Sequence, residues 1–182
     1  DDFERNEYET WTVEGTAFGT GPAAIDAIPS YQGEVNGQGK RVVNSHATAP
    51  GGDVREKDNA VGTLLSREFV IERAFIAFRI GGGRHDAGIA PGASVETDPP
   101  GGTGIHLLID GKIVRSSTGH NANRMRNDFM DVGSLQGKTG RLLIVDRVTR
   151  GWGNIGIDEI VFTDEAPAST EPLEKRPDFG SF

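Results

Sequence analysis

The sequence predicts an all-β protein, a jelly-roll β-sandwich whose strands are mostly antiparallel. One observation is a series of about ten short runs rich in β-branched and other apolar residues. Another is the glycine content, 26 residues in a chain of 182, since glycine marks turns, bulges and close backbone approaches. A third is that no apolar pattern of helical period is long enough for a convincing helix. Together they favour a single sandwich.

The strand-like runs follow one another along the chain with short connections. Most alternate apolar and polar residues, as expected of strands with one face on a core. The run at 74–80 is apolar on nearly both faces and is therefore expected inside a sheet, between two neighbours. The runs are, in order, 10–14, 41–44, 62–66, 69–71, 74–80, 105–109, 112–116, 128–132, 141–145 and 155–162.

Local signals indicate how some of these strands connect. Asp110 and Gly111 tolerate the positive φ angles of a two-residue hairpin, so the flanking strands are expected to be antiparallel neighbours. The triple glycine at 81–83 ends the preceding run abruptly. The segment 86–104 holds glycine and proline with little apolar periodicity, and it is expected to form a long surface loop.

Length and charge limit the architecture and the partners. One sandwich module is predicted over 1–165, followed by a proline-rich linker or tail at 166–182. The formal net charge of −8 and the lack of a basic run argue against nucleic acid as a partner. Without cysteine there is no disulfide or thiolate metal site. No run approaches the roughly 20 apolar residues that span a bilayer.

The closing strand combines apolar and acidic residues. Ile155 and Ile157, and after a break in register Ile160 and Phe162, are expected to face the core. Trp11 lies in an alternating run and is likewise interpreted as a core residue.

Acidic residues at both chain ends suggest a cation. If the first and last strands pair, Asp2 or Glu4 would lie near Asp158, and calcium accepts such carboxylates together with backbone carbonyls. We therefore expect a structural calcium held by Asp2, Glu4 and Asp158. The alternative is that Asp2 and Glu4 are solvated terminal residues and that Asp158 caps a turn or bulge.

Several segments resemble a known class of accessory module. They are 11–22, 43–45 and 62–66 and, most sharply, 78–83, 107–115, 117–121 and 146–155. Across most of 1–165 the chain resembles the β-sandwich modules that accompany levanase- and invertase-type fructan hydrolases, and similar modules in large extracytoplasmic planctomycete proteins with cytochrome-type domains. The resemblance implies a galactose-binding-like jelly roll and sugar binding.

Polar residues in loops beside the predicted strands provide a candidate ligand site. If these loops meet at one edge of the sandwich, they combine an aromatic plate with fixed hydrogen-bonding groups, which is what a sugar requires. The candidate ligand-binding residues are His85, His120, Asn121, Asn123, Arg126, Asp146, Arg150, Trp152 and Asn154.

Each of these residues also has a purely structural interpretation. Trp152 would then plug the end of the core, and Asn121 or Asn123 would merely tolerate a left-handed turn. Arg126 would form ion pairs with nearby acids, and exposed pairs of this kind contribute at most ~1 kcal/mol to stability. The acidic residues at 53–58 are interpreted as a solvated loop, and the remaining histidines show no zinc-ligand spacing.

The resulting hypothesis is a noncatalytic carbohydrate-binding module, cut from a larger extracytoplasmic protein, that binds a fructan or another polysaccharide. Other domains of that protein are the expected neighbours. One alternative is a structural or protein-interaction module that binds no sugar. Another is a small glycan-active enzyme, since the 27 acidic residues offer many carboxylate pairs.

Overall fold

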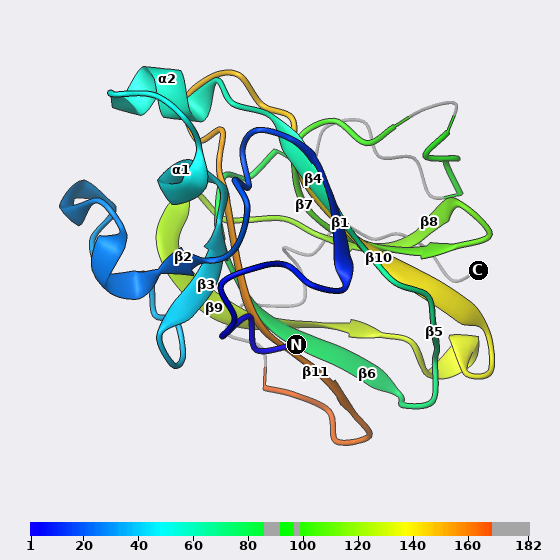
Figure 1. Cartoon of the computed structure of the whole chain (residues 1–182). Helices are drawn as coiled ribbons and strands as arrows, with labels where there is room; N and C mark the ends of the chain where they lie inside the picture. Colours follow the sequence, from blue (N-terminus) through cyan, green and yellow to red (C-terminus); the bar gives the residue numbers. More distant parts are fainter. Residues whose placement is uncertain (86–91, 97–98, 169–182) are drawn as a thin grey trace.

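Two antiparallel sheets form the molecule (Figure 1). The computed structural model describes residues 1–85, 92–96 and 99–168. The first sheet has the order β1-β4-β10-β7-β8, with β5 paired to β10, and the second has the order β2-β3-β11-β6-β9. The predicted β-sandwich is confirmed, and the strand arrangement is consistent with a jelly roll.

The bounds of the elements are as follows. The first sheet contains β1 (Trp11–Gly15), β4 (Gly62–Ser66), β5 (Phe69–Val70), β7 (Thr103–Ile109), β8 (Lys112–Ser117) and β10 (Thr139–Asp146). The second contains β2 (Ala23–Ala24), β3 (Arg41–Asn44), β6 (Phe75–Gly82), β9 (Ala122–Asp131) and β11 (Ile155–Thr163). The helices are α1 (Ser45–Thr48) and α2 (Val54–Asp58), with 3-10 turns η1 (Ile25–Ala27), η2 (Ser30–Gln32) and η3 (Gly133–Leu135). Among the described residues, no helix has the length and apolar character needed to cross a membrane.

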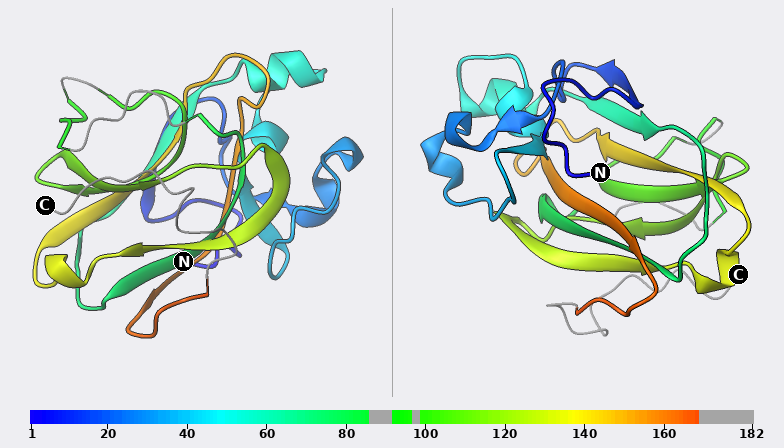
Figure 2. Two further views of the ribbon diagram at one scale, coloured as in Figure 1. Left: turned by 180° about the vertical axis from the view of Figure 1, so that it is seen from behind. Right: turned by 60° about the horizontal axis from the view of Figure 1, so that its bottom comes forward.

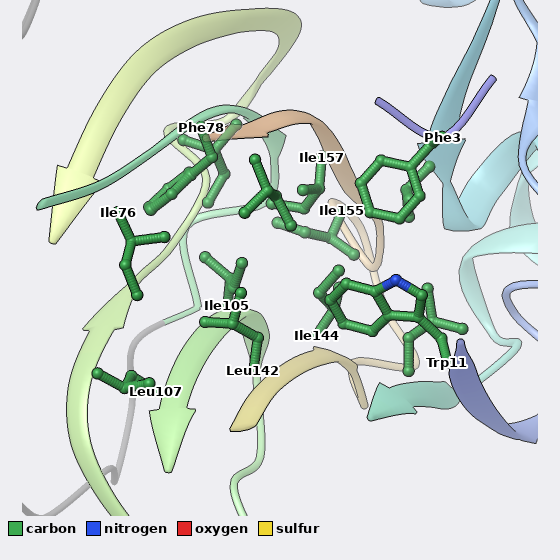
Figure 3. Packing of buried hydrophobic residues seen from close by; sticks show 14 of the residues in the cluster. Phe3, Trp11, Ile76, Phe78, Ile105, Leu107, Leu142, Ile144, Ile155 and Ile157 are labelled. Carbon is green, nitrogen blue, oxygen red and sulfur yellow. The ribbon is translucent and has the colours of Figure 1, made fainter. Parts of the chain in front are cut away.

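The core lies between the sheets and uses alternate positions of the central strands (Figure 3). β6 contributes Ile76 and Phe78, and β10 contributes Ile144 from the opposite sheet. Trp11 belongs to the same cluster at 9% exposure, as predicted, and its ring centroid lies 5.7 Å from that of Phe3. Burial of these side chains supplies the main force that holds the sheets together.

Two predictions about local connections are confirmed. β7 and β8 form an antiparallel hairpin, and Asp110 and Gly111 at its turn have φ angles of 51° and 69°. β6 lies between β11 and β9, as its apolar sequence indicated. Its outward side chains are half-buried, and one of them, Arg79, donates to the Asn36 carbonyl at 2.8 Å.

The expected pairing of the first and last strands is wrong. β1 and β11 belong to different sheets, and β1 pairs with β4. The two ends still meet, because the Ile160 N–H donates to the Asp1 carbonyl at 2.9 Å. The segment before β1 buries Phe3 and Tyr8, at 3% and 4% exposure, in the main core cluster.

A bulge interrupts β11 where the sequence indicated a break in register. The pairing with β6 shifts between Asp158 and Val161, and Glu159 has a φ of 52°. Ile160 is buried as expected, but the prediction for Phe162 is wrong, because its side chain is 38% exposed. Its ring packs edge-on against Phe69 of the other sheet at the margin of the sandwich.

Part of the segment 86–104 adds a short ladder to the edge of the first sheet. Ser94 bridges to Lys112 of β8, and the Val95 N–H donates to the Gly111 carbonyl at 2.9 Å. Val95 packs on an apolar cluster on the outer face of that sheet. The prediction of a surface loop also covers 86–91 and 97–98, which lie outside the described residues, as does most of the tail predicted at 166–182.

At one end of the sandwich, α1 and α2 lie beside the loop that joins β10 to β11 (Figures 1 and 2). The Ile155 N–H at the start of β11 donates to the Ser45 hydroxyl of α1 at 2.8 Å. This bond ties the helical cap to the last strand and sets the position of the candidate site.

The two faces of β11 provide a stability test. Ile157→Ala is expected to lower the free energy of unfolding by about 2–5 kcal/mol, because it opens a cavity in the core. Val161→Ala is the control, since Val161 is 47% exposed on the same strand, and a loss below about 0.5 kcal/mol is expected there. Urea denaturation measures both; equal losses would contradict the assignment of the inner face.

Candidate functional site

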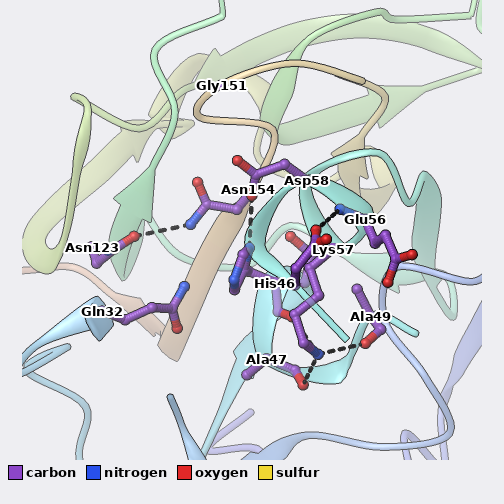
Figure 4. A network of polar contacts seen from close by, with 12 residues as sticks. Gln32, His46, Ala47, Ala49, Glu56, Lys57, Asp58, Asn123, Gly151 and Asn154 are labelled. Atoms are coloured by element: carbon purple, nitrogen blue, oxygen red, sulfur yellow. Dashed lines mark hydrogen bonds and ion pairs between the residues drawn. The ribbon is translucent and has the colours of Figure 1, made fainter. Parts of the chain in front are cut away.

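A cleft lined by aromatic, aliphatic and polar side chains opens at this end of the sandwich. It has a volume of about 180 Å³, and Figure 4 shows several of the side chains that surround it. Its walls come from η2, α1, α2, β9 and the loop that precedes β11. The lining residues are Tyr31, Gln32, His46, Val54, Asp58, Asn123, Trp152 and Asn154.

Trp152 lies on a tight loop and is 39% exposed. Its φ of 63° is unusual for a bulky side chain, and the loop is closed by a bond of 2.7 Å from the Gly153 N–H to the Arg150 carbonyl. A Cβ on Gly153 would lie 2.3 Å from the Val148 carbonyl oxygen, so only glycine fits. The indole therefore lines the cleft and does not plug the core.

Tyr31, His46 and Asp58 form a hydrogen-bonded series among the lining residues. The Tyr31 hydroxyl lies 2.7 Å from His46 Nε2, and His46 Nδ1 lies 2.7 Å from an Asp58 carboxylate oxygen. Tyr31 is 57% exposed, whereas the His46 side chain is 3% exposed. A buried pair therefore supports an exposed aromatic ring.

Amide side chains hold one another in place around the cleft. Asn154 donates from Nδ2 to the Asn123 side-chain oxygen at 3.0 Å, and Figure 4 shows the two facing each other. Gln32 accepts at 2.9 Å from the side chain of Asn44, which also caps α1 by accepting from the Ala47 N–H. Fixed amides of this kind present both donors and acceptors to a ligand.

Of the nine predicted ligand-binding residues, three line this cleft: Asn123, Trp152 and Asn154. A fourth, Arg150, lines an adjoining hollow of about 760 Å³ that also contacts Asp58.

Three others lie in or against the turn that follows β6: His85 belongs to it, and His120 and Asn121 contact it from the connection between β8 and β9. His85 is close to the tryptophan loop, with Nε2 3.3 Å from the Gly151 carbonyl. The His120 N–H donates to the Gly82 carbonyl. Asn121 has a φ of 60° and accepts from the Arg84 N–H at 2.8 Å, which is the structural role considered for it. These residues support the loops beside the cleft.

The last two predicted residues, Arg126 and Asp146, lie outside the cleft. Arg126 is on β9, where its guanidinium lies 3.6 Å from Asp128. Asp146, at the end of β10, is only 1% exposed, so it lies beneath the surface. Neither residue is part of the cleft lining.

Five lining residues were not predicted from the sequence: Tyr31, Gln32, His46, Val54 and Asp58. One signal was present, because Asp53 and Glu56 have the spacing of a capping box. Asp53 accepts from the Glu56 N–H at 2.9 Å, and Glu56 accepts from the Gly52 N–H at 2.6 Å. The acidic stretch is therefore the start of a helix, and the interpretation as a plain solvated loop is wrong.

Asp146 is an unusual buried acid. Neither carboxylate oxygen makes a hydrogen bond of good geometry among the described residues. Burial raises the pKa of Asp146 to about 7; the Ser45 hydroxyl and the Val148 N–H offset part of this rise, and Asp58 adds to it. The ionised carboxylate is therefore disfavoured in the folded protein.

Of the three carboxylates proposed to bind calcium, those of Asp158 and Glu4 contact one segment, 37–41. Asp158 accepts from the Gln38 N–H at 2.7 Å, and Glu4 accepts from the Lys40 N–H at 2.9 Å. Asp2 contacts the Glu4 N–H of its own segment at 3.4 Å. The described residues contain no group of three or more acidic or histidine side chains placed so that they could hold a metal ion together. Two of the three carboxylates thus bind the same segment, and backbone N–H groups donate to the oxygens of both.

Burial raises the pKa of Asp158 to about 6, although the N–H groups of Gln38 and Glu159 oppose the rise. A cation at this position would favour the ionised form and reverse this shift.

Comparisons with known proteins give the following relatives. No family model matches the chain. A protein of Aspergillus rugulosus that carries the name of a glycosyl hydrolase, ecdE, is 29% identical over 168 residues, which cover 90% of this chain and 20% of that protein. The chain thus spans a fifth of that relative.

Solved structures with a similar arrangement include a carbohydrate-binding module, TmCBM61, in complex with β-1,4-galactotriose. It is 17% identical, with a TM-score of 0.48, over 90% of this chain and 94% of that one. The K2 adhesin domain of Lys-gingipain is 15% identical, with a TM-score of 0.49, over 90% and 97% of the two chains. What the cleft of this chain binds has to be argued from its own geometry.

Asp146 provides a test by pH. Because its folded pKa lies above its ordinary value, its ionisation destabilises the fold as pH rises from about 4 to about 7. Asp146→Asn is expected to gain stability over the unmodified protein by roughly 2–4 kcal/mol at pH 8 and much less at pH 4. Denaturant unfolding at each pH measures the difference. Asp26→Asn, at an exposed site, is the control; a difference that does not depend on pH would contradict the raised pKa.

Proposed function

We propose that the chain is a noncatalytic carbohydrate-binding module of a larger exported protein, and that the glycan binds in the cleft between Tyr31 and Trp152. The observation that carries the proposal is the pair of exposed aromatic rings at a cleft whose other lining residues are three amides, an imidazole, the carboxylate of Asp58 and the aliphatic Val54. The apolar faces of a sugar pack on aromatic rings, while its hydroxyls need fixed donors and acceptors.

The cleft supports binding better than hydrolysis. Most glycosidases place two carboxyl groups on either side of the scissile bond. Among the described lining residues there is one carboxylate, Asp58, and it is bonded to His46. Asp146 has a raised pKa, but it is too deeply buried to reach a bound glycan.

The relative named as a glycosyl hydrolase supports the modular part of the proposal. This chain covers only a fifth of it, which agrees with an accessory module inside a longer enzyme. A fructan, or another polysaccharide acted on by such an enzyme, is the proposed ligand, and an extracytoplasmic location is the proposed setting.

The test is a glycan panel followed by calorimetry with variants. Trp152→Ala and Tyr31→Ala are each expected to weaken binding about tenfold or more, because aromatic anchors in a cleft dominate such contacts. Phe162→Ala is the matched control, since Phe162 is 38% exposed and Trp152 39%, but Phe162 is not part of the cleft. Melting temperatures check that each variant folds.

Three outcomes would count against the proposal. Binding that is indifferent to both aromatic substitutions would move the site elsewhere. A panel with no ligand, together with a protein partner captured by the same surface, would favour an interaction module. Shortened products in the glycan mixture would show an enzyme.

A structural calcium between Glu4, Asp158 and segment 37–41, with Asp2 nearby, remains part of the proposal. Calcium is expected to raise the melting temperature and chelator to lower it, because a ligand held only by the folded state stabilises that state. Asp158→Asn should remove the response, and Asp26→Asn should keep it. Identical melts with calcium and with chelator, and no metal by elemental analysis, would exclude the site.

A further inference from the structure

The series Tyr31, His46 and Asp58 joins three elements through two short hydrogen bonds, each 2.7 Å long. The Tyr31 and His46 rings meet edge to face, with centroids 5.6 Å apart and planes at 89°. The His46 side chain is 3% exposed and that of Asp58 16%. The hydroxyl of Tyr31, an exposed residue that lines the cleft, is therefore bonded to a buried imidazole, whose other nitrogen is bonded to an acid.

Elementary hydrogen-bond chemistry assigns the protons in this series. An ionised carboxylate only accepts, so His46 Nδ1 has to carry the proton that lies toward Asp58. The remaining nitrogen of the neutral ring, Nε2, then accepts the proton of the Tyr31 hydroxyl. The Tyr31 oxygen keeps its lone pairs for the cleft.

The charged groups around the series are mainly acidic. Asp53 and Asp146 are the other acids that act on it, the first on Tyr31 and the second beside Asp58. The Lys57 ammonium donates to the Ala49 carbonyl at 2.7 Å and lies 3.5 Å from the His46 carbonyl, which directs it to the backbone of α1. The pKa of Tyr31 is raised, first by partial desolvation of its hydroxyl and then by the negative charges of Asp58 and Asp53. The hydroxyl therefore keeps its proton.

We propose that Asp58 and His46 are positioning residues that make the Tyr31 hydroxyl a hydrogen-bond acceptor toward the ligand. This inference rests on the proposed function of the cleft and adds a specificity rule: the sugar hydroxyl that meets Tyr31 must donate. Protonation of the imidazole reverses the rule. Solvent then supplies a proton to Nε2, and the new N–H donates to the Tyr31 oxygen. The Tyr31 hydroxyl keeps its own proton and rotates it toward the cleft, where it acts as a donor.

Nitrogen NMR of the histidine side chains tests the proton assignment without any ligand. At pH 8, His46, identified by its loss in His46→Gln, is expected as the Nδ1–H tautomer. Asp58→Asn should convert it to the Nε2–H tautomer, because the asparagine amide can donate to Nδ1. Asp53→Asn removes the same charge from the N-cap of α2, where asparagine caps equally well, and should leave the tautomer unchanged.

Calorimetry with a glycan from the panel tests the consequence for binding. Affinity is expected to fall about three- to tenfold as the pH is lowered from about 8 to about 5, because a protonated imidazole would turn the Tyr31 hydroxyl from an acceptor into a donor. Asp58→Asn should show the weaker affinity already at pH 8. Tyr31→Phe, which keeps the ring but lacks the hydroxyl, should lose the pH dependence, while Asp53→Asn should retain it.

The outcomes separate the two proposals. An Nε2–H tautomer in the unmodified protein at pH 8 overturns the role of Asp58 and His46, whether or not a glycan binds. The same pH dependence in Tyr31→Phe as in the unmodified protein overturns the acceptor role of Tyr31. The Nδ1–H tautomer together with a panel that yields no glycan contradicts the proposed function and leaves the orientation of Tyr31 supported.

Discussion

The cleft depends on the hydrogen bond from the Ile155 N–H to the Ser45 hydroxyl. On one side of that bond is α1, which carries His46; on the other is the loop that carries Trp152 and Asn154. The bond is buried, so its loss would leave an unsatisfied N–H in the core, which typically costs about 1–3 kcal/mol. Two parts of the chain that are more than 100 residues apart are thereby held in one geometry.

Two features that lower the stability of the fold lie close to this hydrogen bond. Trp152 has a backbone conformation that bulky residues rarely adopt, and Asp146 is buried close to Ser45 without a good partner. Each such feature typically costs about 1–3 kcal/mol. The large core between the sheets offsets these terms, so the end of the sandwich can be shaped for a ligand while the centre holds the fold together.

Much of the fold was accessible from sequence because it depends on local patterns. Alternation placed Trp11 and Ile157 in the core, and the Asp110–Gly111 turn determined a hairpin. The cleft was accessible only in part, because its walls are set by long-range packing. His46 and Tyr31 are 15 residues apart, with no spacing motif that relates them, and they meet only because α1 and η2 fold over the end of β3. The burial of Asp146 could not be inferred from its position at the end of a strand.

The ladder that residues 92–95 add to β8 has a consequence for self-association. β8 ends the first sheet, and an uncovered terminal strand is a template onto which another chain can dock by backbone pairing. Here residues 92–95 occupy part of that template, and Val95 packs on the neighbouring aliphatic side chains. Deleting these four residues would therefore put solubility at risk before it affected the fold.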